Sequence, residues 1–161
     1  MLALDVAFEE YFQVTDKDQL GKWLDQNDTN DVYGSFLDEV VNLEYGTLTK
    51  KQLNMMLNTI PVGIVFVDTE NFIQYLNMPE DHKEMRNTSI VGRNLKYSFS
   101  PKLYSRFEKI IDDFKSGNCE LYEYKELASV NGKTFKYSYM PVNDKNGKYN
   151  GFVEFTEIVE D

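Results

Sequence analysis

The sequence predicts an α+β fold: a five-stranded antiparallel sheet with helices on one face, preceded by a helical extension at the N-terminus. Three observations predict it. Two short apolar stretches flank a polar turn, a long amphipathic helix follows, and three further strand-like stretches complete the sequence. Two strands, a helical crossover and an antiparallel meander form one sheet and leave the helices on a single face. The length of 161 residues suits one domain with an accessory segment.

The accessory segment is the acidic N-terminus. Residues 1–46 carry 11 Asp and Glu against 2 Lys, whereas residues 47–161 are nearly neutral. Helices are expected at 4–13, 16–26 and 31–43, because N-cap residues and acidic first turns precede apolar positions. The pattern breaks at NLEYGTL, so two domains are predicted, an extension at 1–46 and a compact domain at 47–161. The extension is either a solvated surface or a docking face for a basic partner.

Composition and charge argue against several functions. A net charge of −10 disfavours nucleic-acid and anionic-membrane binding, since both require a basic face. No apolar run approaches the ~20 residues of a membrane span, and MLALDVAFEEYF lacks the basic start of a signal peptide. The single cysteine, Cys119, fits a reducing compartment. We therefore expect a cytoplasmic protein that binds neither nucleic acid nor membrane.

A flanking helix is predicted for residues 49–60. Thr49 and Gln52 have the spacing of a capping box, and Pro61 ends the helix because the residue before a proline avoids helical backbone angles. One apolar stripe runs along it, formed by Leu53, Met56, Leu57 and Ile60. The long helix described below already covers one face of the sheet. The stripe is therefore expected on the opposite face or in a homodimer interface.

The domain core, residues 61–158, begins with a hairpin. GIVFVD predicts a strand buried on both faces and FIQYLN its partner. Asp68 and Asn71 are expected to bond the backbone of the turn between them. Asn77 is expected to cap a helical turn that contains Pro79. Further short helical pieces are expected within residues 78–96, around IVGRNL.

The clearest element is the long helix in SPKLYSRFEKIIDDFKSG. Ser100 is a cap, Pro101 takes the first helical position and Gly117 ends the helix. Its apolar stripe consists of Leu103, Phe107, Ile110, Ile111 and Phe114. Three strands follow, in CELYEYKELASV, KTFKYSYMPV and KYNGFVEFTEIV. Asn131-Gly132 and Asn146-Gly147 are expected to supply the positive φ angles of tight hairpins.

This order of elements, with these residues, resembles a PAS domain from Leu48 to Glu157. The resemblance is carried by PVGIVFVDTENFIQYLN, IVGRNL, PKLYSRFEKIIDDFKSG and VNDKNGKYNGFVEFTE. The chain is most similar to the C-terminal PAS domain of bacterial proteins that also carry a hemerythrin HHE cation-binding domain. The resemblance implies a sensory or regulatory module. It also implies that the Pro-Val-Gly break turns the chain from the flanking helix into the central hairpin.

Two departures limit what carries over from those relatives. They have Cys-His-Pro-Pro before the long helix, where this chain has Ser98-Phe99-Ser100-Pro101. A metal, haem or redox role that depends on that Cys or His is therefore not expected here. The Asp-Ile-Thr that commonly ends a PAS domain and leads into an output helix is replaced by EIVED. If Asp161 is the end of the protein, signals are expected to leave only through the N-terminal helices or through a change in association.

Few residues are candidates for chemistry. The single histidine, His82, lies in the charged run PEDHKEMR and is expected at the surface. One His and one Cys are a poor set for a transition metal, so no metal site is expected. The PAS resemblance implies that a haem ligand would be a His on the long helix and a photoadduct thiol a Cys on the short helix before it. The long helix here has no His and VGRNLKYS has no Cys, so haem and flavin are disfavoured. Cys119 is expected to be inert. No catalytic arrangement is visible, and we expect no enzyme.

The aromatic residues indicate either a packed core or a ligand pocket. Phe135, Tyr137 and Tyr139 alternate along one strand and therefore share one face. Several phenolic hydroxyls inside a core need partners, which a polar ligand or water can provide. Arg93 either orients an anionic ligand or ties a loop to nearby carbonyls. The pocket candidates are Phe66, Tyr75, Leu95, Phe107, Ile111, Tyr124, Tyr137, Tyr139, Phe155 and Arg93.

The sequence thus favours a non-catalytic sensory or regulatory PAS module that binds a small molecule in its core and signals through association. The alternative is a ligand-free PAS interaction module that dimerises through its sheet or flanking helix. A chromophore or co-purified small molecule would favour the first, and a clean apo dimer the second.

Overall fold

The computed structural model describes residues 39–84, 86–127 and 132–159. The chain divides into two compact units, Met1–Met55 and Met56–Asp161. In the first, β1 (Val40–Asn42) pairs antiparallel with β2 (Thr47–Thr49), and Gly46 in the turn has a φ of +97°. The domain boundary expected between residues 46 and 47 stays a prediction.

The helix predicted at 31–43 is wrong at its C-terminal end. Val40–Asn42 form a strand, because the β-branched pair Val40-Val41 favours extended backbone and Gly46 lets the chain fold back on itself. Residues 31–38 and the helices expected at 4–13 and 16–26 lie outside the described residues.

The predicted flanking helix is present as α4 (Lys50–Thr59). The capping box forms as expected: the backbone N–H of Thr49 donates to Gln52 Oε1 at 2.9 Å, and that of Gln52 donates to Thr49 Oγ1 at 3.1 Å. The border between the two compact units falls within this helix. None of its residues is buried.

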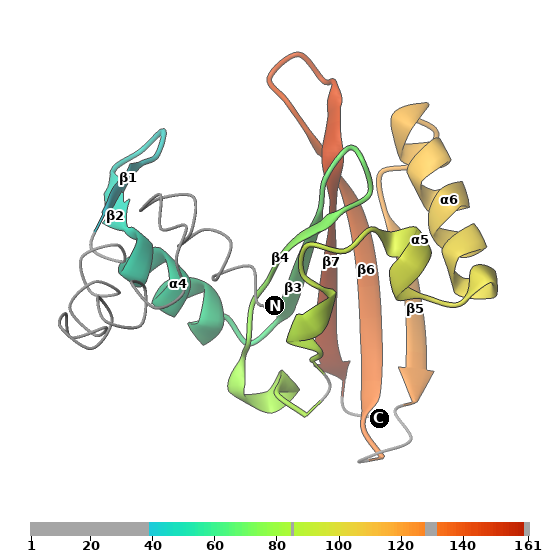
Figure 1. The fold of residues 1–161 in the computed structure, drawn as a ribbon, viewed down its shortest axis with the longest axis horizontal. Coiled ribbons are helices and arrows are strands. Elements are labelled where there is room, and N and C mark those ends of the chain that lie inside the picture. Colours follow the sequence, from blue (N-terminus) through green and yellow to red (C-terminus); the bar gives the residue numbers. More distant parts are fainter. Residues whose placement is uncertain (1–38, 85, 128–131, 160–161) are drawn as a thin grey trace, which may run out of the picture. The chain divides into compact units, whose positions relative to one another are not determined.

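The second unit contains the predicted antiparallel sheet (Figure 1). Its strands are β3 (Gly63–Val67), β4 (Ile73–Leu76), β5 (Tyr122–Leu127), β6 (Thr134–Asn143) and β7 (Tyr149–Val159). They lie in the order β4-β3-β7-β6-β5, and every neighbouring pair is antiparallel. The part of the fold class that concerns this domain, an α+β fold with a five-stranded antiparallel sheet and helices, is confirmed. The first and last strands of the domain, β3 and β7, lie side by side at the centre of the sheet.

The hairpin β3–β4 is closed by the predicted turn. Asp68 Oδ1 accepts from the backbone N–H of Glu70 and of Phe72, each at 2.9 Å. Asn71 contributes differently from the expectation: it takes the left-handed conformation, with a φ of 69°, and its Oδ1 is buried without a hydrogen-bond partner. The side chain of Asp68 therefore fixes the turn, while Asn71 supplies its reversed backbone.

The role predicted for Asn77 is wrong. The residue that caps η1 (Glu80–His82) is Pro79, whereas Asn77 is completely buried. Its Nδ2 donates to the carbonyls of Leu57 and Val62 at 2.9 Å, and its Oδ1 accepts from the N–H of Ile64 at 2.6 Å. Asn77 therefore bonds the polar backbone groups that the Pro61-Val62-Gly63 break leaves without regular partners.

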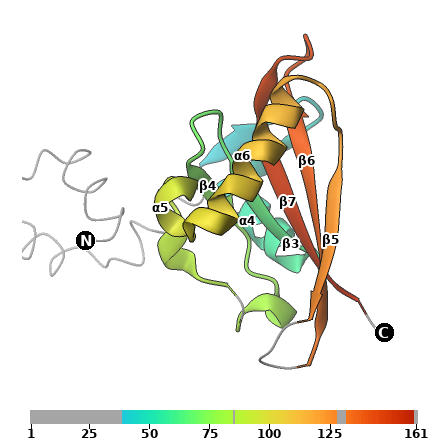
Figure 2. The same cartoon turned by 90° about the vertical axis from the view of Figure 1, so that its right-hand side faces the viewer.

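The crossover from β4 to β5 is helical, as expected. It comprises η1, η2 (Thr88–Ile90), α5 (Leu95–Ser98) and α6 (Pro101–Lys115). Ser100 Oγ accepts from Leu103 N–H at 3.4 Å at the start of α6, and Gly117 at φ +69° follows its end. Figure 2 shows α5 and α6 on one face of the sheet. We call this the inner face and the opposite one the outer face.

The β6–β7 hairpin follows the prediction only in part. Gly147 has a positive φ of 77°, but Asn146 does not, since Asn71 is the single non-glycine residue with positive φ in the described part of the chain. Instead, Asp144 Oδ1 accepts from the N–H groups of Asn146 and Lys148. The Asn131-Gly132 turn lies outside the described residues, apart from Gly132.

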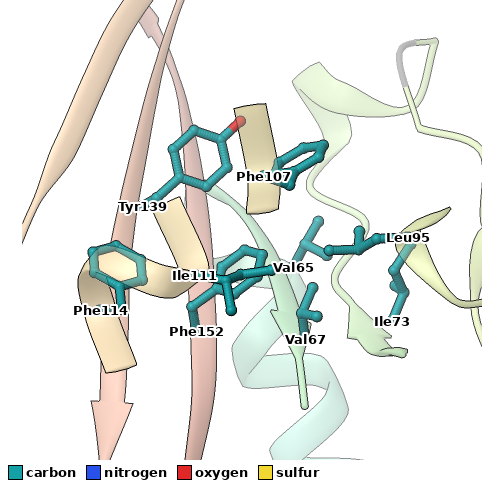
Figure 3. Packing of buried hydrophobic residues seen from close by; sticks show 9 residues of the cluster. All are labelled: Val65, Val67, Ile73, Leu95, Phe107, Ile111, Phe114, Tyr139 and Phe152. Atoms are coloured by element: carbon teal, nitrogen blue, oxygen red, sulfur yellow. The ribbon is translucent and has the colours of Figure 1, made fainter. Parts of the chain in front are cut away.

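The core lies between the inner face and α6 (Figure 3). Along α6, Phe107, Ile111 and Phe114 are buried, while Leu103 and Ile110 are half-buried, so the predicted stripe faces the sheet. Phe152 of β7 lies among them, 6.4 Å between ring centroids from both Phe107 and Phe114. In the described ranges, no helix is long and apolar enough to span a membrane.

Candidate ligand cavity

A cavity of about 360 Å³ lies between the inner face and the crossover segment. Small-molecule sites in proteins occupy roughly 300–1,000 Å³, so this volume suits a small ligand. One part of the wall is apolar and comes from the sheet, α5, α6 and the loops before them. It consists of Val65, Val67, Ile73, Ile90, Leu95, Phe99, Leu103, Phe107 and Phe152.

Three tyrosines on β5 and β6 line another part of the wall. Antiparallel register places Tyr124 opposite Tyr137, and their rings stack with centroids 4.9 Å apart. The ring of Tyr124 is also nearly parallel to that of Tyr139 at 5.9 Å, and the two hydroxyls are 3.1 Å apart. The cavity therefore has a phenolic side that can offer hydrogen bonds to a guest.

The carboxyl group of Glu154 faces the cavity from the central strand β7. Tyr139 shares a hydrogen bond with it, and Thr156 Oγ1 donates to its Oε1 at 3.2 Å. Burial raises the pKa of Glu154, and its bond with Tyr139 and the charge of Arg86 act in the opposite direction. Burial, followed by the charge of Glu154, raises the pKa of Tyr137 to about 12. Tyr137 is therefore a neutral hydrogen-bonding group at physiological pH.

His82 is buried, not exposed as the sequence suggested. Its side chain is 1% exposed, lines the cavity and packs edge-on against Phe135 at 6.3 Å. Nε2 lies 2.9 Å from the carbonyl oxygen of Thr156. Because a carbonyl only accepts, Nε2 must carry the proton, and the neutral ring then presents Nδ1 as a bare acceptor. Nδ1 is buried and has no partner.

The position of the Arg86 side chain accounts for the presence of a glycine, Gly63, at the start of β3. A Cβ built on Gly63 would lie 1.9 Å from Arg86 Nη2 and 3.0 Å from His82 Cδ2. The guanidinium therefore occupies the space above a residue that has no side chain. Nη2 is buried there without an acceptor, and Arg86 also lines the cavity. Burial lowers the pKa of Arg86, whereas the nearby charge of Glu154 raises it.

Comparison with known proteins agrees with this geometry. The family model described as "PAS domain" matches residues 53–158. The chain belongs to the PAS domain family. PAS domains are sensory and signalling modules and are generally non-catalytic.

Solved PAS structures and related folds are similar to this chain. The C-terminal domain of a Streptococcus mutans protein is 25% identical, with a TM-score of 0.68, over 77% of this chain and 95% of that one. The PAS domain of BvgS from Bordetella pertussis is 12% identical, with a TM-score of 0.51, over 69% and 86%. Vibrio cholerae VqmA is 18% identical, with a TM-score of 0.52, over 71% and 52%. No protein with a curated description matches significantly.

Five of the ten pocket candidates line the PAS cavity. They are Leu95, Phe107, Tyr124, Tyr137 and Tyr139. Phe135, Tyr137 and Tyr139 share the inner face as expected: Phe135 packs against the ring of His82, which lines the cavity as both tyrosines do. Ile111 is buried in the core cluster beside the cavity but does not line it.

Phe66, Tyr75 and Phe155 lie on the outer face of the sheet. Side chains alternate along a strand, so Val65 and Val67 of β3 point inward and Phe66 points outward. Tyr75 pairs with Phe66, and Phe155 lies between the inward-facing residues Glu154 and Thr156. The prediction that these three aromatic residues join the inner-face tyrosines is wrong, because strand alternation and not residue type decides which face of the sheet a side chain occupies.

Arg93 is exposed and does not line the cavity. Its backbone N–H donates to Ile90 O at 3.0 Å, and its carbonyl accepts from Ile73 N–H at 3.0 Å. Arg93 therefore holds this loop in place through its backbone groups. The cation that faces the cavity is Arg86.

Three residues of the cavity wall are not among the candidates that the sequence predicts: Glu154, His82 and Arg86. The sequence does contain a pattern that points to Glu154. It occupies the inward-facing position of β7 between Phe152 and Thr156, and it is the one charged residue among the inward-facing positions of that strand. Nothing local distinguishes His82 and Arg86 from the surface charges around them. Throughout residues 39–84, 86–127 and 132–159, no group of three or more His, Cys, Asp or Glu side chains is placed to hold a metal ion.

The buried position of His82 leads to a titration prediction. Burial lowers its pKa below the ordinary 6.5, as does the charge of Arg86, while the Thr156 bond and Asp81 act against this. The imidazole of His82 therefore takes up a proton less readily in the folded protein than in the unfolded chain. The stability that His82 contributes is present above pH 6.5 and is lost as pH falls through the folded pKa.

Because His82 is the only histidine, the ring resonances of untagged protein follow it directly by NMR. We expect a midpoint below 6.5, and urea should return the midpoint to the ordinary value. A midpoint at or above 6.5 in the folded protein would contradict the buried, neutral ring.

Proposed function

We propose that this protein is a non-catalytic sensory or regulatory PAS module that binds a small molecule in its inner cavity and signals through a change in association. The observation that carries the proposal is the cavity itself: a volume of about 360 Å³ with an apolar wall and a cluster of hydrogen-bonding groups on the other side. Such a combination suits a small molecule with an apolar body and a polar end.

Unpartnered polar atoms support ligand binding over a closed core. His82 Nδ1 and Arg86 Nη2 are buried without hydrogen-bond partners, and both side chains line the cavity. A buried polar group without a partner costs about 1–3 kcal/mol, and a charged one costs more. Folded proteins rarely leave such groups unsatisfied. A ligand or ordered water that bonded them would recover part of this cost.

We propose that the ligand is neither haem nor flavin. His82, the single histidine, already donates through Nε2 to Thr156 O. The single cysteine, Cys119, is half-buried next to the start of β5, with its Sγ 3.1 Å from Leu121 O, and does not line the cavity. Neither side chain has the environment expected of an axial ligand or of a photoadduct thiol. We expect the freshly purified protein to lack visible absorption.

We also propose the narrower relationship, that this domain is of the kind found at the C-terminus of bacterial hemerythrin-associated proteins in the cytoplasm. Its support is the sequence likeness along residues 48–157. For association, we propose a homodimer formed through α4, because Met56 is 48% exposed and no residue of this helix is buried. The ligand-free interaction module remains the second candidate, since it needs the same surface.

The experiment is a thermal-shift screen of a metabolite library with wild-type protein. A ligand at one hundred times its Kd adds about 2.7 kcal/mol, which for a chain of this size raises Tm by on the order of 5–10 °C. Phe107→Trp fills the cavity and should abolish the shift. Tyr97→Trp adds the same ring at a site that is 79% exposed, and should leave the shift unchanged.

Sedimentation of the same samples distinguishes the two candidates. The sensory module predicts that the compound which raises Tm also changes the proportion of dimer. If no compound raises Tm and the protein sediments as a dimer, the ligand-free interaction module is correct. A monomer at all concentrations would contradict the dimerisation proposed for both.

A further inference from the structure

We propose that the ligand carries a neutral carboxamide-like head group, lactams included, whose carbonyl accepts from Arg86 and whose N–H donates to Glu154. This inference rests on the proposed function, because it assigns the chemistry of a ligand in the same cavity. It concerns two residues that the topology brings together from distant parts of the chain, one after η1 and one on β7.

Arg86 and Glu154 line one cavity but do not form an ion pair with each other. The ion pairs of the described residues, defined by N–O distances up to 4.0 Å, do not include this one. The two charges nevertheless act on each other, since each shifts the pKa of the other toward the charged form, against the effect of burial. Both side chains therefore line one cavity without an ion pair between them, and we infer that a polar group of the ligand bridges them.

The hydrogen-bonding capacities of the two side chains set the direction of the bridge. A guanidinium only donates, and Arg86 Nη2 is buried without an acceptor. Glu154 accepts from Thr156 and interacts with Tyr139, but a carboxylate has about four acceptor positions and so retains capacity for another donor. The bridging group needs an acceptor toward Arg86 and a donor toward Glu154.

Charged head groups fit this site less well than a neutral dipole. A carboxylate would satisfy Arg86 but face Glu154, with Glu126 also in the cavity wall. An ammonium group would satisfy Glu154 but face Arg86. Placing like charges together in a partly desolvated site is costly. A carboxamide carries a carbonyl acceptor and an N–H donor on neighbouring atoms without net charge, and its apolar body can contact Phe107, Leu95 and Val65.

The test uses four probes with one body and different head groups: 3-phenylpropionamide, 3-phenylpropionate, 3-phenylpropylammonium and headless propylbenzene. Binding to the full chain is measured by calorimetry and by ligand-observed NMR. We expect the amide to bind at least about tenfold more tightly than the other three, since a hydrogen bond to a charged group contributes on the order of a tenfold or larger change in Kd.

Two variants, at Arg86 and at Glu154, test the assignment through the change in head-group preference that each should cause. Arg86→Met removes the cation and should weaken the amide about tenfold while strengthening the ammonium probe. Glu154→Gln keeps the shape of the side chain and should weaken the amide while strengthening the carboxylate. Loss of structure cannot produce these opposite changes. Arg93→Met and Glu157→Gln alter the same charges outside the cavity, and should leave all four affinities unchanged.

The outcomes separate this inference from the proposed function. If propylbenzene binds as tightly as the amide, the cavity binds small molecules but the head-group assignment is wrong. Tightest binding of the carboxylate or the ammonium probe also overturns it, as does an amide preference that both variants retain. If no probe binds, the assignment fails, and the proposed function is then decided by the metabolite screen alone.

Discussion

Asn77→Ala is expected to lower the free energy of unfolding by about 3–5 kcal/mol, because it leaves three partly buried backbone groups without the partner that they have in the folded protein, at about 1–3 kcal/mol each. Those groups are the N–H of Ile64 and the carbonyls of Leu57 and Val62. Asn77 itself is 0% exposed, so water cannot replace its amide without a rearrangement. Urea unfolding followed by circular dichroism measures the change.

Asn118→Ala is the matched control. Asn118 is exposed, and its side chain donates to Ser116 Oγ at 3.0 Å. Its removal should change stability by no more than about 0.5 kcal/mol. Equal effects of the two substitutions would show that Asn77 does not hold the entry to β3, and the account of the Pro-Val-Gly break would then be wrong.

Gly151→Ala is the second substitution with a large expected effect. Gly151 has a φ of +113°, and a Cβ there would lie 2.2 Å from the carbonyl oxygen of Val67 and 3.1 Å from Asp68 Cα. Val67 is the last residue of β3 and Asp68 follows it, so these backbone atoms cannot move without disturbing the pairing of Val67 with Phe152. We expect a loss of about 3 kcal/mol or more, from backbone strain and overpacking together.

Gly147→Ala is the control that separates the cost of backbone strain at positive φ from the cost of the steric clash expected at Gly151. Gly147 also has a positive φ, +77°, but a Cβ there would meet nothing within 4 Å. This control should lose only the roughly 1–2 kcal/mol that an L-residue costs in the left-handed region. Thermal and urea unfolding of both variants give the difference. If the two alanines are equally costly, close packing at the β3–β7 centre contributes nothing.

Local sequence patterns were sufficient for the order and type of the elements in the PAS domain. The capping box at Thr49 and the Ser100-Pro101 start of α6 depend on residues within one turn of each other, so the sequence contains the whole interaction. The same holds for Asp68, whose carboxylate bonds the turn that follows it. Short-range rules succeed where the partner is a near neighbour in the chain.

The errors share a different physical origin. Val40 fits a helical stripe, yet it pairs with Thr49, so a hairpin partner decided its state. Asn77 looked like a cap because Pro79 follows it, yet its partners lie 13 to 20 residues away. Phe66 is aromatic like the inner-face tyrosines, but strand alternation directs its side chain to the outer face.

The sequence by itself determined the fold class, the helical crossover and the aromatic inner face, because amphipathic periodicity and capping are properties of neighbouring residues. The tertiary structure alone decided which polar groups meet inside. Glu154 reaches the cavity because β7 lies between β3 and β6. His82 and Arg86 reach it because Gly63 leaves room above β3 for an imidazole and a guanidinium. Burial changed those side chains from apparent surface charges into hydrogen-bonding groups of the cavity, and burial depends on contacts between distant segments, which no local pattern contains.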